Sequence, residues 1–156
     1  MMHIKRLPAL RRYASFDIMP IFRPLDCGLA LKTSLSTLQR LVLDGRALQA
    51  DFLIPEDTGR RLRVSFADVE IIRTLDEMPL STEETEKWVG LQSEHFAYEV
   101  TDAHFWRSQS EALKLTIPDL KHYCFITGWT CLDVISKHPP IFSVIHVDED
   151  SDHGES

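Results

Sequence analysis

The 156-residue sequence lacks the features that mark membrane, disulfide-rich and secreted proteins. No apolar run approaches the ~20 residues that a membrane-spanning helix needs. The three cysteines are an odd number and do not suggest a disulfide framework. Pro8, Arg11 and Arg12 interrupt the N-terminal region, which therefore has no apolar segment of the secretory type. We expect a protein of the reducing cytoplasm, not associated with a membrane.

Basic residues are also scarce, because 17 Lys and Arg stand against 24 Asp and Glu, a formal net charge of −7. This balance argues against a nucleic-acid-binding protein, since phosphate contacts need a basic surface. The charge is uneven, with a basic N-terminal arm at 1–14 and an acidic flexible tail at 148–156. We expect one globular domain at 15–147, and leave open whether the arm is a targeting segment.

No short catalytic or nucleotide-binding motif is present. The sequence has no GxGxxG, GxxxxGK[ST], GxSxG, HExxH or CxxC pattern, which argues against common nucleotide, serine-hydrolase and zinc-protease sites. We expect no cofactor. We lean against an enzyme and leave the question open, because a catalytic site assembled across strands leaves no such motif.

The chain does have apolar residues, 44% of the total, in short runs that often alternate with polar residues. A period of two is typical of β-strands. The clearest example is a hairpin formed by 120–126 and 131–135 around Thr127-Gly128-Trp129-Thr130, with Gly128 expected at a positive φ. This register places Cys124 opposite Asp133.

A second hairpin is predicted from residues 48–54 and 61–66. Its five-residue loop places Phe52 opposite Leu62, so that apolar residues face one another. The apolar pattern shifts near Ala67-Asp68, where we expect a β-bulge or a bend. A further strand is expected at 141–145, after two prolines that end the preceding pairing.

Three other segments are assigned from local patterns. A helix is expected at 34–44, because four apolar residues recur there at helical spacing and Gly45 can end it. A third hairpin is expected from 94–100 and 103–110, although 103–110 can instead begin a helix capped by Asp102. Residues 76–91 are interpreted as a loop with a short helix starting at Ser81 or Thr82, and 16–31 as an extended segment with an edge strand.

Successive hairpins predict antiparallel sheet, because parallel strands need long crossover connections. The expected fold is mainly β, with α+β possible. We expect an antiparallel β-sandwich or partly closed barrel with one short helix packed on one side or end.

Two clusters of polar residues are candidate sites. His122, Cys124, Cys131 and Asp133 share one face of the predicted hairpin and are candidate metal ligands, with buried core residues as the alternative and favoured interpretation. His95, Glu99 and His104 are candidate catalytic residues, because a Glu facing a His across a strand pair suits acid–base chemistry. The alternative for this second cluster is an ordinary surface ion pair.

The candidate ligand or partner contacts are three aromatic and two basic residues: Trp88, Trp106, Trp129, Arg61 and Arg63. We expect a small soluble binding or interaction domain with a protein partner or with self-association, for example as a homodimer, through an exposed strand edge. The alternative is a small enzyme or small-molecule-binding β-barrel. Its His/Glu/Asp-lined pocket would lie among His95, His104, His122 and Asp133.

Overall fold

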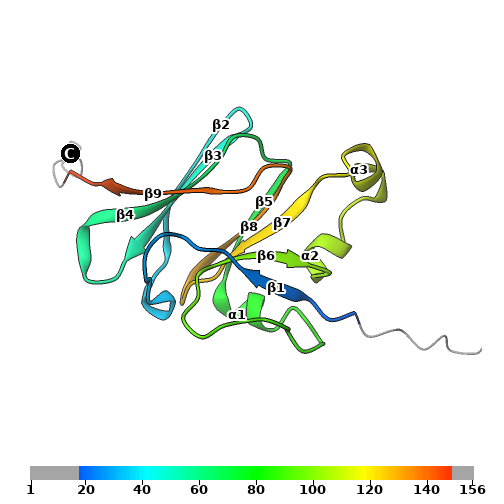
Figure 1. Ribbon diagram of the computed structural model, residues 1–156, viewed down its shortest axis with the longest axis horizontal. Coiled ribbons are helices and arrows are strands. Elements are labelled where there is room, and N and C mark those ends of the chain that lie inside the picture. Colours follow the sequence, from blue (N-terminus) through cyan, green and yellow to red (C-terminus); the bar gives the residue numbers. More distant parts are fainter. Residues whose placement is uncertain (1–17, 149–156) are drawn as a thin grey trace, which may run out of the picture.

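The protein is an antiparallel β-sandwich, as expected from the sequence (Figure 1). The computed structural model describes residues 18–148, so the predicted arm at 1–14 and all of the predicted tail except Asp148 lie outside it. One sheet has the order β1-β6-β7-β8-β5 and the other β2-β3-β4-β9, and neither closes into a barrel. No helix in this part of the chain is long and apolar enough to cross a membrane.

The five-stranded sheet contains β1 (Ile21–Pro24), β5 (Ile71–Asp76), β6 (Ala97–Thr101), β7 (Lys121–Phe125) and β8 (Thr130–Ser136). The four-stranded sheet contains β2 (Leu38–Asp44), β3 (Ala47–Ile54), β4 (Asp57–Phe66) and β9 (Ile141–His146). The helices are short: the 3₁₀ helix η1 (Thr33–Leu35), α1 (Glu77–Ser81), α2 (His104–Arg107) and α3 (Glu111–Thr116).

The main core lies between the two sheets and is rich in phenylalanine. Phe52 of β3 contacts Phe96 edge to face at 4.7 Å between ring centroids, and Phe125 of β7 packs against Phe66 of β4. Successive side chains of a strand point to opposite faces, so alternate residues of each strand enter this layer. Burial of these large aromatic groups supplies much of the driving force for folding.

The two clearest predicted hairpins are confirmed in their registers. Phe52 lies opposite Leu62 in the β3–β4 pair, and Cys124 lies opposite Asp133 in the β7–β8 pair. The expected strands at the edge (β1) and after the prolines (β9) are also present. The bend at Ala67-Asp68 is where the chain leaves one sheet for the other, because β5 pairs with β8.

The helix predicted at 34–44 is wrong. The segment forms η1 and then β2, which pairs with β3. Leu38 and Leu41 both pack against the core, although they are three positions apart and an odd spacing normally places residues on opposite faces of a strand, because the register shifts between Leu38 and Arg40. This irregularity lets a strand copy the spacing of an amphipathic helix.

The hairpin predicted from 94–100 and 103–110 is also wrong. β6 pairs with β1 and β7, and the chain turns at Asp102, which has a φ of 60°, into α2 and then α3. The helical alternative is therefore correct for 104–107, although its N-cap is Ala103 and not Asp102. Within 76–91 the short helix is α1, which begins at Glu77, earlier than expected.

Candidate functional site

A network of charged side chains lies on the face of the five-stranded sheet that points away from the other sheet. Arg73 of β5 is directly opposite Asp133 of β8, and its Nε and Nη2 donate to Oδ2 of Asp133 at 3.0 and 2.7 Å. His122 of β7 donates from Nε2 to Oδ1 of the same carboxylate at 2.7 Å. His122 and Asp133 are both buried. The carboxylate is therefore shared by two donors from the strands on either side of it.

Glu83 and Phe105 complete the network from outside the sheet. Arg73 donates to both carboxylate oxygens of Glu83, at 2.6 and 2.9 Å. The guanidinium carbon of Arg73 lies 4.2 Å from the ring centre of Phe105, and that ring meets His122 edge to face at 5.2 Å. The network thus joins three strands to α2 and to the segment after α1.

The electrostatics favour a charged Asp133. Burial acts to raise the pKa of Asp133, but the hydrogen bond from His122, together with the charge and hydrogen bonds of Arg73, outweighs burial and lowers the pKa below its ordinary value. Burial likewise opposes the charge on Arg73, and its bonds with Glu83 and Asp133 outweigh it and raise the pKa of Arg73. Asp133 and Arg73 are therefore both held in their ionised forms.

The two buried cysteines beside this network are held as thiols. Burial raises the pKa of the Cys124 and Cys131 thiols, so both stay protonated at neutral pH. The described residues contain no group of three or more His, Cys, Asp or Glu arranged to hold a metal. Of the four predicted ligands, His122 and Asp133 are joined by a hydrogen bond.

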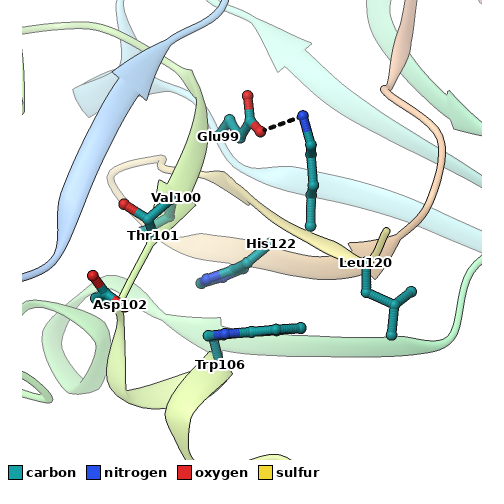
Figure 2. Close-up of a pocket in the computed structure, with 8 residues that line it drawn as sticks. Glu99, Val100, Thr101, Asp102, Trp106, Leu120 and His122 are labelled. Atoms are coloured by element: carbon teal, nitrogen blue, oxygen red, sulfur yellow. Dashed lines mark ion pairs between the residues drawn. The ribbon is translucent and has the colours of Figure 1, made fainter. Parts of the chain in front are cut away.

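A cavity of about 220 Å³ lies at the end of β6 and β7, next to His122 (Figure 2). Its wall includes Trp106 of α2, and Figure 2 shows the side chain of His122 above the ring of Trp106 in this view. Glu99 forms ion pairs with Arg23 and, at 3.0 Å, with Lys121. Nδ1 of His122 is buried and has no hydrogen-bond partner within residues 18–148.

A second hollow, of about 290 Å³, surrounds Trp129 in the turn between β7 and β8. It is lined by Asp76, Glu77, Met78, Gly128, Trp129 and Thr130. Trp129 is 67% exposed and Met78 is 73% exposed. Asp76 and Glu77 are exposed, and neither carboxylate has a cationic partner in the described part of the chain. A large apolar ring and two free negative charges therefore share one hollow.

The three predicted catalytic residues do not meet. Nε2 of His95 bonds to the carbonyl of Leu25 at 2.9 Å, and Glu99 pairs with Arg23 and Lys121. The predicted Glu99–His104 contact is wrong because the chain turns into α2 at His104, whose backbone N–H donates to Glu84. No acid–base pair is formed by this set.

The predicted contact residues have different surroundings. Trp88 stacks on Phe22 with 4.9 Å between ring centres, and Trp106 lies beneath Lys114, so both are packed against the protein. Arg63 makes a bidentate pair with buried Asp51. Arg61 is half-buried on the same strand. Trp129 is the predicted tryptophan that remains exposed.

Sequence reasoning missed Arg73 and Glu83 of the network and the residues that surround Trp129. Arg73 and Asp133 are 60 positions apart, and only the pairing of β5 with β8 brings them together. The turn and α1 meet through a bond from the N–H of Glu77 to the carbonyl of Trp129 (2.7 Å), which no local pattern shows. No protein-family model matches this chain, and comparisons with curated proteins and with solved structures also give no match.

Proposed function

We propose that this protein is an interaction domain that binds a lysine or arginine side chain of a partner protein in the hollow around Trp129. The observation that carries this proposal is the exposure of the Trp129 ring beside two carboxylates without cationic partners in the described residues. Tryptophan is enriched among the residues that dominate binding energies at protein interfaces.

The chemistry of the hollow suits a cation on an aliphatic stem. A cation over the face of a tryptophan gains about 0.5–1 kcal/mol at an exposed site and about 2 kcal/mol or more when water is excluded. Asp76 and Glu77 would pair with the charged group, and Met78 would pack against the methylene groups of the stem. The net charge of −7 adds long-range attraction for a basic partner.

The test is a titration with a peptide that carries several lysines and arginines, followed by tryptophan fluorescence and calorimetry. We expect the peptide to bind and the affinity to fall as salt is added. Trp129→Ala should weaken binding about 2- to 30-fold, the range that corresponds to loss of a cation–π contact. A double variant, Asp76→Asn with Glu77→Gln, should weaken it as well.

The control removes the same charge elsewhere. Asp44, at the end of β2, and Glu56, in the turn between β3 and β4, are both exposed, so Asp44→Asn with Glu56→Gln should leave peptide binding close to that of the unmodified protein. If both double variants weaken binding equally, net charge and not the hollow recruits the peptide. Binding that survives Trp129→Ala unchanged would contradict the proposal.

A second candidate function is the binding of a small aromatic hydrogen-bond donor in the cavity of Figure 2. The observation that favours it is the buried Nδ1 of His122, which has no hydrogen-bond partner among the described residues. In the neutral ring this atom can accept a bond while Nε2 donates to Asp133. Phenol, which carries one hydroxyl donor, is a suitable probe for NMR titration. We expect fluorobenzene, of similar shape without the donor, to bind about 2- to 10-fold more weakly. Equal affinities would contradict this role.

A further inference from the structure

The sandwich has four edge strands in its described part, and β9 differs from the others. β1 contains Arg23 and Pro24, and its outer side bonds to the backbone of Val89. Charged residues also lie in β2, which has an irregular register, and in β5. Such charges, prolines and irregularities protect exposed edges from pairing with other chains.

β9 has none of these protections. Its sequence, Ile-Phe-Ser-Val-Ile-His, contains no Asp, Glu, Lys, Arg or Pro. Ile141 is 66% exposed and Val144 is 41% exposed. Figure 1 shows β9 running along β4 as the last strand of its sheet, and no described strand pairs with its outer side.

The direction of the free backbone groups follows from the pairing of β9 with β4. The N–H of Val147 donates to the carbonyl of Gly59 at 2.9 Å, and hydrogen-bonded pairs alternate along an antiparallel ladder. Toward β4, therefore, point the backbone N–H and C=O groups of three residues of β9, which are Ile141, Ser143 and Ile145. The N–H and C=O groups of Phe142 and Val144 point outward, where no described residue pairs with them.

We propose that β9 is a homodimerisation edge, which pairs antiparallel with β9 of a second copy about a two-fold axis at Ser143. In this register the outward groups of Phe142 in one copy meet those of Val144 in the other, so each such pair exchanges both backbone hydrogen bonds. The two four-stranded sheets would join into one continuous sheet. A two-fold axis makes the interface isologous and closed.

Side chains select this register from its neighbours. With Ser143 on the axis, Ile141 faces Ile145 on one side of the sheet and Phe142 faces Val144 on the other, while serine faces serine. Moving the axis to Val144 places Ser143 opposite Ile145 and Phe142 opposite His146. The strand is therefore complementary to itself in one register, and a second copy is the partner that it fits.

Sedimentation and light scattering test the dimer directly. We expect a species of twice the 18.0 kDa chain mass that dissociates on dilution. Ile141→Lys should give a monomer, because it places a charge against Ile145 of the other copy. Adding Ile145→Glu to this variant should restore the dimer, because the new charges face each other in the proposed register. Leu115→Lys, on exposed α3, is the control and should leave the dimer intact.

Cross-linking tests the register independently. In the proposed pairing of two β9 strands, Ser143 of one copy faces Ser143 of the other as a non-hydrogen-bonded pair. The Cα atoms of such a pair are about 4.5 Å apart, within reach of a disulfide. In a Cys27→Ser background, mild oxidation of Ser143→Cys should give disulfide-linked dimers, since the other two cysteines are buried. Gln49→Cys, exposed in the middle of the same sheet, should not.

Several outcomes would overturn the inference. A monomer at millimolar concentration shows that β9 does not recruit a second copy. A dimer that survives Ile141→Lys, or one that Ser143→Cys does not cross-link, uses another surface. None of these results bears on the Trp129 hollow, whose peptide titration does not depend on β9.

Discussion

At the scale of single residues, Gly128 shows that a correct assignment can rest on the wrong cause. It lies in the expected turn, but its φ is not positive, unlike those of Gly28, Gly45 and Gly90. Glycine is needed because the turn packs against η1: the N–H of Gly128 donates to the carbonyl of Thr33 at 2.8 Å, and a Cβ there would collide with the carbonyl of Ser34.

We therefore predict that Gly128→Ala lowers the free energy of unfolding by about 1–3 kcal/mol, the usual cost of overpacking. Gly59→Ala is the matched control, because its Cβ would meet only Oδ1 of Asp57 at 4.0 Å and its φ is not in the left-handed region. This control should change stability by less than about 0.5 kcal/mol. Urea denaturation of both variants is the measurement, and equal stabilities would contradict the close contact.

At the scale of elements, hairpins were predictable from the sequence because apolar alternation acts locally. The expected five-residue loop was wrong: Ile54 pairs with Asp57, so the turn is Pro55-Glu56, and the register shifts between Leu53 and Ile54. The β3–β4 and β7–β8 registers follow from matching apolar residues across a short loop. This matching also brought His122 and Asp133 to one face, which is the part of the charged network that the sequence revealed. Where paired strands are close in sequence, local patterns therefore predicted both the pairing and the site residues that the pairing brings together.

The remaining elements depended on contacts that local patterns do not contain. β2 has the leucine spacing of a helix, and only pairing with β3 and the shift after Leu38 make it a strand. In the 103–110 segment, Phe105 and Trp106 favour a strand, but Phe105 is buried against His122 and Arg73 as part of α2. Tertiary packing overrode propensity in both segments.

At the scale of the whole molecule, the network around Asp133 joins parts of the chain that are distant in sequence. It connects β5, β7 and β8 to Glu83 after α1 and to Phe105 in α2. Breaking a buried ion pair by removing one partner leaves an uncompensated charge and costs about 3–5 kcal/mol. The network should therefore couple the stability of the covering helices to that of the sheet, and should couple both to pH.

The sign of the pH dependence follows from Asp133. Because the pKa of Asp133 is lower in the folded protein than in the unfolded chain, its contribution to stability is complete above the unfolded value, about 3.9, and is lost as pH falls further. We predict that the urea midpoint falls as the pH is lowered below about 3.9. Asp133→Asn should lower stability at neutral pH by about 3–5 kcal/mol and should make this acid decline shallower, because the titrating group is gone.

Asp119→Asn, at an exposed position, should keep the original pH profile. A decline of undiminished steepness in Asp133→Asn would assign the acid sensitivity to other carboxylates, such as Glu94, whose pKa is lowered by the backbone N–H of Ser34.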